Sequence, residues 1–269
     1  MNRPHELTQR QRWDAYFVDP QNQTLRNRKG ITNPEVWARA ESDLVAGRSS
    51  ELPNFGFDKD TLAEELCAIH QYLFQDCYDW AGQYRDVDMV KSHPGIPDSE
   101  VSFSPWDSIP DQLDAIQERI DSIEWDELHL SEKKNHLAEI HAKLNYVHPF
   151  REGNGRATRA FMEEFAGRYD VDLEWDGYDD ALLFASAASM MHESGLALEP
   201  WALLYEDVAE QATWHDEPIV GIDELLDTSL LGSMTPLDLS QSSYADSEPE
   251  QGQSLPESSM VNLWHSHDL

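Results

Sequence analysis

The residues most able to do chemistry lie in one short segment, from His148 to Arg159. The segment reads HPFREGNGRATR, so a histidine is followed by a turn with two glycines and then by a helix-forming stretch. Small residues at the start of a helix let backbone N–H groups approach an anion, and the helix dipole favours negative charge there. Gly153, Asn154 and Gly155 therefore predict an anion-binding nest at a helix N-terminus.

The side chains around this predicted nest suit a polyphosphate. Arg156 and Arg159 are three residues apart, hence on one face of the helix, and two guanidiniums can hold phosphate oxygens in bidentate fashion. Glu152 would repel a phosphate unless a cation intervened, so we interpret it as a Mg²⁺ ligand that bridges to phosphate oxygens. Asn154 offers neutral N–H donors to a phosphate oxygen. His148 is the nearby group whose ordinary pKa lies closest to neutrality, and we predict it to be the general base in a solvent-facing turn.

Each feature of this segment has a structural explanation when it is taken alone. A histidine before a proline is usually structural, glycines after a helix usually cap it, and paired arginines usually bind surface carboxylates. Their joint occurrence favours a functional site, because about nine specified residues at roughly 5% usage each do not coincide by chance.

Helices are the elements predicted to position the segment. Apolar spacing predicts a helix from residue 34, with Val36, Ala40 and Leu44 on its buried side. Asp60 is the predicted N-cap of the next helix, which Gly82 would end in a left-handed conformation. Ser131 is the predicted N-cap of the helix that leads to His148. The remaining helices are predicted over residues 110–123, 131–147, 154–167, 179–194 and 200–211.

Residues 86–103 follow a different pattern from the helices. Apolar and polar residues alternate around Val87, Met89, Val101 and Phe103, and the sequence HPGIP separates the two arms. This alternation is typical of a β-hairpin or an extended loop.

Composition limits the kinds of partner. The 269 residues include 52 acidic and 19 basic side chains, for a net charge of −33, and no Lys or Arg follows Arg168. Such a charge argues against binding to nucleic acid or to an anionic membrane. Only two cysteines occur, Cys67 and Cys77, so a disulfide framework is excluded. No run approaches the roughly 18 apolar residues of a membrane span, and the N-terminus lacks an apolar leader, so we expect a cytoplasmic protein.

The last part of the chain has its own composition. Residues 213–269 are acidic, rich in Ser, Pro and Gln, and without periodicity. They cannot bury enough apolar area to offset the entropy lost on ordering, so we predict a disordered tail. The predicted division is a folded domain over residues 1–212 and a tail over residues 213–269.

The segment from His148 resembles the Fic family signature, HPFx(D/E)GNGRxxR, and matches it at every specified position. Three other stretches also look like Fic landmarks: LRNRKGITNPE near Leu25, IHQYLFQDCYDWAGQYRDV from Ile69, and LEPWALLYE near Leu198. The resemblance covers roughly residues 15–210. It implies an all-α (mainly helical) core with a small β-hairpin flap, in which the Asp86–Phe103 stretch is the flap.

The resemblance also implies an activity, the transfer of AMP from ATP to a Ser, Thr or Tyr hydroxyl of a target protein. His148 would deprotonate the hydroxyl, which attacks the α-phosphate in line, and Glu152 would hold Mg²⁺. The flap would hold the target segment in extended form by strand addition. The anion hole and the grip on the leaving pyrophosphate would be formed by Gly153, Asn154, Gly155, Arg156 and Arg159.

Several alternatives remain open at the level of sequence. A related subfamily that phosphorylates its target carries Lys where this chain has Gly155, so Gly155 favours nucleotide transfer. Members that use UTP, GTP or CDP-choline share most of the signature, so the donor base is not fixed. A catalytically idle scaffold is a further possibility, against which the retained His148, Glu152 and Arg159 argue.

The resemblance also has implications for how the protein is regulated. Many Fic proteins carry an inhibitory helix with the pattern (S/T)xxxE(G/N), whose glutamate pairs with the second arginine, here Arg159. The sequence has no convincing copy of it; Thr61 to Glu65 has the spacing but is followed by Leu66. This resembles the class in which a separate small antitoxin supplies the helix, so we expect such a partner and a toxin role.

Overall fold

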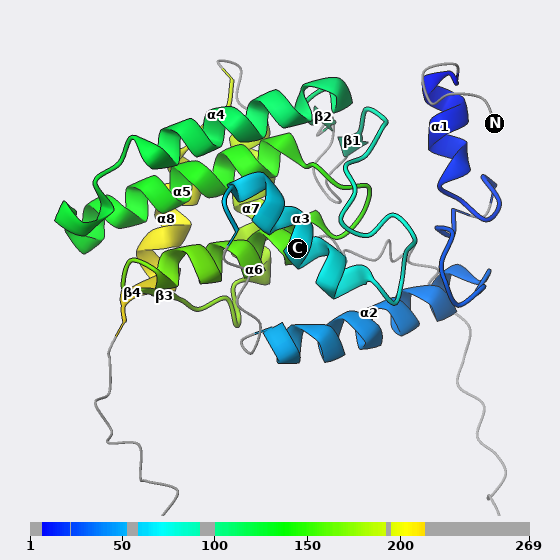
Figure 1. Cartoon of the computed structure of the whole chain (residues 1–269), viewed down its shortest axis with the longest axis horizontal. Helices are drawn as coiled ribbons and strands as arrows, with labels where there is room; N and C mark the ends of the chain where they lie inside the picture. The colour runs from blue at the N-terminus through cyan, green and yellow to red at the C-terminus, as the bar shows by residue number, and fades with distance from the viewer. Residues whose placement is uncertain (1–6, 22, 53–58, 92–99, 192–194, 213–269) are drawn as a thin grey trace, which may run out of the picture. The chain divides into compact units, whose positions relative to one another are not determined.

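Eight α-helices make up most of the chain that the structure describes (Figure 1). The computed structural model describes residues 7–21, 23–52, 59–91, 100–191 and 195–212. The predicted tail, residues 213–269, lies outside these residues, as does the Pro/Gly turn of the predicted hairpin. The mainly helical fold class is confirmed, whereas the domain boundary after residue 212 stays a prediction.

The first three helices each begin after a polar side chain that accepts a hydrogen bond from the N–H group three residues further on. The caps and helices are Thr8 for α1 (Gln9–Ala15), Asn33 for α2 (Pro34–Glu51) and Thr61 for α3 (Leu62–Phe74). Helix α1 was not among the predicted elements, and the predicted cap Asp60 lies one residue before the true one.

The buried face of α2 differs from the predicted one. Val36 is 53% exposed, and the buried positions are Trp37, Glu41 and Val45. The helix is thus rotated by one residue relative to the predicted stripe, because the indole of Trp37 and the carboxylate of Glu41 both find partners in the interior. Trp37 donates its indole N–H to the hydroxyl of Tyr78 at 3.2 Å.

Gly82 does adopt a left-handed conformation, with φ of 76°, but it does not cap α3, which ends at Phe74. Its N–H donates to Nδ1 of His70 at 2.8 Å. A β-carbon at this position would lie 2.8 Å from the side chain of Gln71, so the loop needs a glycine for close packing against α3.

The predicted hairpin is confirmed, although its paired strands are short. β1 (Val90–Lys91) and β2 (Val101–Ser102) are antiparallel, with Val90 opposite Ser102 and Lys91 opposite Val101. Phe103 continues β2 and donates its N–H to the carbonyl of Met89 at 3.1 Å, which extends the pairing by one bond. We refer to residues 86–103 as the flap.

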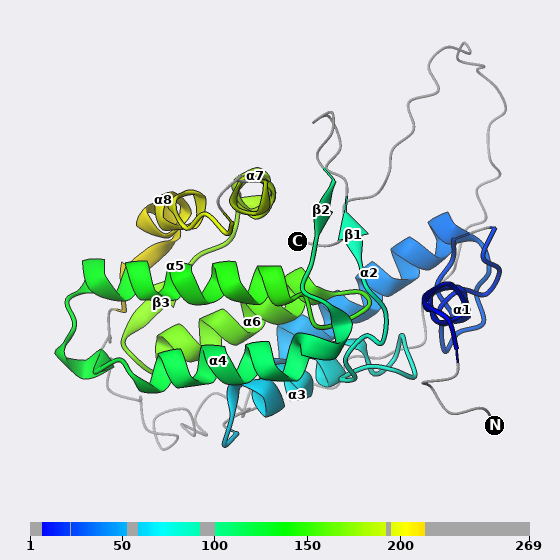
Figure 2. The ribbon, with the colours of Figure 1, turned by 90° about the horizontal axis from the view of Figure 1, so that it is seen from above.

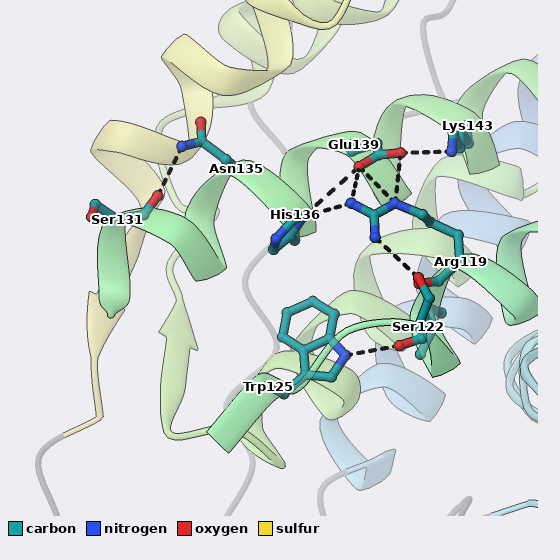
Figure 3. Close-up of polar contacts among 9 residues, drawn as sticks. Arg119, Ser122, Trp125, Ser131, Asn135, His136, Glu139 and Lys143 are labelled. Carbon is teal, nitrogen blue, oxygen red and sulfur yellow. Dashed lines mark hydrogen bonds and ion pairs between the residues drawn. The ribbon is translucent and has the colours of Figure 1, made fainter. Parts of the chain in front are cut away.

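An ion-pair cluster connects helix α4 (Ile109–Asp121) to helix α5 (Leu130–Val147) (Figure 3). Glu139 on α5 lies 3.0 Å from a guanidinium nitrogen of Arg119 on α4 and 2.7 Å from Nζ of Lys143. The N-cap of α5 is His129, not the predicted Ser131, which lies inside the first turn. The cluster fixes α5, the helix that ends at His148, against α4.

The second half of the described chain begins with α6 (Asn154–Gly167), whose predicted bounds are confirmed. The rest contains α7 (Asp179–Met190), α8 (Glu199–Val208) and two short strands, β3 (Val171–Leu173) and β4 (Ala209–Gln211). The strands pair antiparallel, with Leu173 opposite Ala209. The last residues of the helix predicted over 200–211 are therefore a strand.

Helix α5 lies in the middle of this arrangement. It packs against α4, α6, α7 and α8, and α3 packs against α2, α4 and α6. Figure 2 shows α7 and α8 on one side of α5, with α6 and α4 running beside it. The core joins these helices through fully buried large side chains such as Phe74, Phe150, Phe161 and Trp201. Within the described residues no helix is both long and apolar enough to cross a membrane.

Candidate active site

His148 ends α5 in a left-handed conformation, with φ of 48° and ψ of 61°. Its N–H donates to the carbonyl of Leu144 at 3.0 Å, so the residue is still tied to the last helical turn. The predicted solvent-facing position is wrong, because His148 is only 4% exposed. The ring of Phe103 covers the imidazole, with 3.8 Å between the ring centroids and 13° between their planes.

Gly153 is the residue that lets the chain turn from His148 into α6. It is the N-cap of α6, with φ of 81°, a conformation that strains other residues. A β-carbon there would lie 2.1 Å from Cζ of Phe74, a fully buried side chain of α3. Position 153 therefore tolerates only glycine on two independent grounds.

The side chain of Asn154 stabilises the turn through hydrogen bonds to the backbone of the turn. Its Oδ1 accepts the N–H of Phe150 at 2.8 Å, and its Nδ2 donates to the carbonyl of Phe150 at 2.8 Å. Asn154 is only 3% exposed. From the sequence we expect this amide to face a phosphate, whereas in the structure it braces the loop and one of its N–H groups already donates to Phe150.

The N-terminus of α6 presents an anion-binding geometry. The first N–H groups of any helix lack acceptors within the helix, and the first turn of α6 carries no acidic residue to neutralise them. Gly155 adds no side chain to this turn. His148, Asn154, Gly155 and Arg159 line one small cavity, so the structure brings the predicted base, nest and second arginine together.

Arg156 and Glu152 contact each other across one turn of the motif. A guanidinium nitrogen of Arg156 lies 3.2 Å from Oε1 of Glu152, and the same oxygen accepts the N–H of Gly153 at 3.1 Å. The same nitrogen of Arg156 also lies 2.7 Å from Oε1 of Glu41. The guanidinium sits over the ring of Phe74, 4.7 Å from its centroid.

Glu41 is a site residue that sequence reasoning missed. It comes from α2, is 7% exposed, and accepts hydrogen bonds from both Arg156 and the hydroxyl of Tyr78. The sequence does contain an indication that Glu41 is buried, because it lies on the same helical stripe as Trp37 and Val45. An acid on a buried stripe requires a cationic or hydrogen-bonding partner.

Arg159 lines two cavities of very different volume. The cavity that it shares with His148 is about 20 Å³, room for about one water molecule. Arg159 also lines a cleft of about 570 Å³, together with other arginines and glutamates at α6 and with the end of α2. The lining includes Leu52, Arg156, Arg159, Glu163 and Arg168. Burial lowers the pKa of Arg159, and the neighbouring charge of Arg156 contributes in the same direction.

His70 supports the motif from α3. Its ring stacks on Phe150 with 3.8 Å between centroids. Because Gly82 donates to Nδ1, the ring proton is on Nε2, which donates to the carbonyl of Glu152 at 3.0 Å. Burial lowers the pKa of His70 to about 3, so the ring stays neutral and keeps this donor arrangement. His70 thereby positions the backbone of Glu152.

Arg151 connects the motif to the N-terminal helix. It is 8% exposed, and its guanidinium lies 4.3 Å from the ring centroid of Trp13 and 5.3 Å from that of Phe17. Cation–π contacts of this kind are strongest when the cation is desolvated. Position 151 is one of the three unspecified positions of the signature, so the signature gave no indication of a role for Arg151.

The Glu152 carboxylate fits the predicted metal role by its donor chemistry. Mg²⁺ is commonly bound through one or two carboxylates together with phosphate oxygens and waters. The side chain of Glu152 is 17% exposed and directly precedes Gly153, the N-cap of α6, so it would offer one hard oxygen ligand near this helix N-terminus. Its bond to Arg156 would have to be shared or exchanged when a cation binds.

Comparison with known proteins places this arrangement in a family. Residues 60–166 match the model of the Fic/DOC family. A relative from Salmonella typhimurium, named “Probable protein adenylyltransferase Fic”, is 30% identical over 163 residues, which are 60% of this chain and 76% of that protein. A protein adenylyltransferase from Bartonella henselae is 30% identical over 214 residues, 72% of this chain but only 37% of the longer relative.

Solved structures agree with the sequence relatives. The N-terminal Fic domain of a cell filamentation protein from Bartonella quintana, with bound ADP, has a TM-score of 0.65 and 25% identity, covering 74% of this chain and 95% of that one. The helical core, the flap and the glycine turn after His148 together define a Fic domain. The chain belongs to the Fic/DOC family.

Proposed function

We propose that the protein is an adenylyltransferase that transfers AMP from ATP to a Ser, Thr or Tyr hydroxyl of a target protein. The observation that carries the proposal is the shared cavity in which His148, at the end of α5, meets the N-terminus of α6. The relatives named as protein adenylyltransferases support it, as does the ADP bound to the Bartonella quintana domain.

The proposed chemistry uses few groups. His148 accepts the proton of the target hydroxyl as the hydroxyl oxygen attacks the α-phosphorus of ATP. The bond from the α-phosphorus to the bridging oxygen breaks, and pyrophosphate leaves. The backbone N–H groups at the start of α6 stabilise the charge on the non-bridging oxygens. Glu152 would hold Mg²⁺, which when bound neutralises phosphate charge.

The two arginines are not equivalent in this scheme. Arg156 already contacts two carboxylates, Glu41 and Glu152, whereas Arg159 lines both the His148 cavity and the larger cleft. We therefore assign the main grip on the leaving pyrophosphate to Arg159, with Arg156 holding Glu152 in place. The cavity beside His148, at about 20 Å³, is too small for a nucleotide. The side chains that line this cavity, including Lys91 of the flap, must therefore move when ATP binds.

The flap is the proposed contact with the target protein. Its paired strands place Phe103 directly on the ring of His148, so an extended segment that adds a strand to the flap would bring a hydroxyl close to the base. The large negative charge of the chain supports a protein partner over nucleic acid or an anionic membrane. The need for ATP supports a cytoplasmic reaction.

A small antitoxin is the proposed regulator, and the protein the toxin of such a pair. The cleft of about 570 Å³ presents Arg156, Arg159 and Arg168 along one side of α6. A helix lying there could place a glutamate against Arg159 and occupy the donors meant for phosphate. A pull-down from the native host should recover a small helical protein, and its addition should abolish label transfer.

The decisive experiment compares two labels. The purified chain is incubated with Mg²⁺, a cell lysate and ATP labelled at either the α- or the γ-phosphate. We expect protein-bound label from α-labelled ATP only. Label from γ-labelled ATP would instead indicate phosphotransfer, and no label from either, with the antitoxin absent, would favour a scaffold. Parallel reactions with α-labelled UTP and GTP test the donor base.

A further inference from the structure

Arg85 is the most deeply buried cation of the described residues, with 1% of its surface exposed. It lies in the loop between α3 and β1, outside the signature segment. Its side chain donates to four backbone carbonyls, and it forms no ion pair with a carboxylate among the residues that the structure describes. These are His148 at 2.8 Å, Val87 at 2.6 Å, Val147 at 3.1 Å, and Ser104.

Two of these carbonyls belong to the end of α5. The last carbonyls of a helix lack partners within it and carry the negative end of the helix dipole, so a cation is favoured there. Arg85 caps Val147 and His148 in this way, and its own backbone N–H donates to the carbonyl of Pro149 at 2.8 Å. The peptide units on both sides of the His148 side chain are therefore fixed by one residue.

The other two carbonyls lie at the two ends of the flap, that of Val87 within it and that of Ser104 directly after it. Val87 precedes β1 and Ser104 follows β2, so the guanidinium holds both arms where they leave the hairpin. Ser104 in turn donates its N–H to the carbonyl of Tyr146 at 3.0 Å. Phe103, whose ring covers His148, is the neighbour of Ser104 and takes its position from this anchor.

We propose that Arg85 is a positioning residue that sets the register between the flap and His148. The proposal rests on the proposed function, because it concerns how the target hydroxyl is aligned with the base. Within the described part of the chain, Arg85 forms no hydrogen bond with the N-terminus of α6 or with the arginines of the proposed phosphate site. Its loss should therefore impair transfer much more than ATP binding.

Lysine cannot replace Arg85 in this role. Binding four carbonyls from two directions requires the planar fork of a guanidinium, whereas an ammonium concentrates its donors on one atom. Burial lowers the pKa of Arg85 to about 10, so the group is still charged at neutral pH. Arg85→Lys keeps the charge and removes the fork, which makes it the informative variant.

The test combines a spectroscopic readout with kinetics. In proton NMR the Cε1 proton of His148, identified by its loss in His148→Asn, should carry a ring-current shift that Phe103→Leu removes. We expect Arg85→Lys to move this resonance toward its position in Phe103→Leu. With α-labelled ATP and lysate acceptors, its apparent kcat should fall at least tenfold, while the apparent KM for ATP stays within threefold.

Leu137→Ala, a cavity variant in the core of α5, serves as the control for lost stability. It should leave the His148 resonance and the transfer rate near those of the wild type. An Arg85→Lys protein with an unchanged resonance and rate would overturn the proposal, as would an equal kinetic loss in Leu137→Ala. If Arg85→Lys does not fold, Phe103→Leu takes its place, and wild-type transfer by that variant would overturn the proposal. If the wild type transfers no label but the His148 resonance still moves in Arg85→Lys, the coupling between the flap and His148 is supported and the proposed function fails.

Discussion

The ring of Phe103 lies parallel to the imidazole of His148, 3.8 Å away between centroids. One residue comes from the flap and the other from the end of α5, and 45 positions separate them in the sequence. The contact shields one face of the proposed base from water. It also means that any displacement of the flap changes the surroundings of His148.

His148→Asn should abolish label transfer with little loss of structure. Asparagine tolerates the left-handed conformation at this position, whereas alanine would add about 1–2 kcal/mol of strain. Removing a general base typically costs about 10²–10⁴-fold in rate. The check is transfer from α-labelled ATP beside a thermal melt, in which loss of the Phe103 stack should cost about 1 kcal/mol. Full transfer by the variant would refute the assignment of the base.

Gly153→Ala should destabilise the domain by about 2–4 kcal/mol, from backbone strain and from overlap with the ring of Phe74. Gly47→Ala is the matched control, because Gly47 lies within α2, near its C-terminal end, with open space where a β-carbon would be added. Alanine there should be neutral or stabilise by up to about 1 kcal/mol. Urea unfolding of both variants measures the difference, and equal stabilities would contradict the close approach of Phe74.

Glu41→Gln should lower the free energy of unfolding by about 2 kcal/mol. The substitution keeps the shape of the side chain but removes a charged hydrogen-bond acceptor from both Arg156 and Tyr78. Asp43→Asn, at an exposed position of the same helix, should change stability by less than about 0.5 kcal/mol. If denaturant unfolding gives the two variants the same stability, the Glu41–Arg156 contact contributes nothing.

His141 should make the protein sensitive to acid. Burial, aided by the charge of Arg159, lowers its pKa from 6.5 to about 3, and the ring contacts the hydroxyl of Tyr205 at 3.0 Å. As the pH falls, the unfolded chain therefore protonates this histidine at a higher pH than the folded chain does. The contribution of His141 to stability is complete above pH 6.5 and declines as the pH falls toward 3, by about 1.4 kcal/mol per unit.

Urea unfolding at pH 7.5 and pH 5.5 tests this prediction. The wild type should lose about 1.4 kcal/mol more than His141→Gln over this interval. The comparison cancels the contribution of the equally buried His70, which is present in both proteins. An identical loss in the two proteins would mean that His141 is not held neutral by the fold.

The catalytic segment could be predicted from sequence because its geometry is local. Helix, turn and helix are contiguous from α5 to α6, and the glycine between them permits the left-handed conformation that the turn requires. The exposure of His148 could not be predicted, since it depends on Phe103 from a distant hairpin. The same holds for Arg85 and His70, whose contacts with the segment cross more than 60 positions.

Helix α2 shows where periodicity alone misleads. Val36, Ala40 and Leu44 form a regular apolar stripe, yet Trp37 and Glu41 on the adjacent stripe are the buried residues. Apolar spacing does not reveal the burial of Glu41, because this burial depends on hydrogen bonds from Arg156 and Tyr78, which lie on other elements. β3 and β4 were missed for another reason, because strands of three residues are too short to show alternation.

The contact between Glu41 and Arg156 also bears on how separable this domain is. The stretch that matches the family begins at residue 60, so the counter-ion of a signature arginine belongs to sequence that the family model does not include. A fragment trimmed to the matched stretch would keep all the signature residues and lose the carboxylate that Arg156 contacts. Chimaeras that exchange the catalytic segment between relatives would lose the same contact unless α2 is exchanged together with the segment.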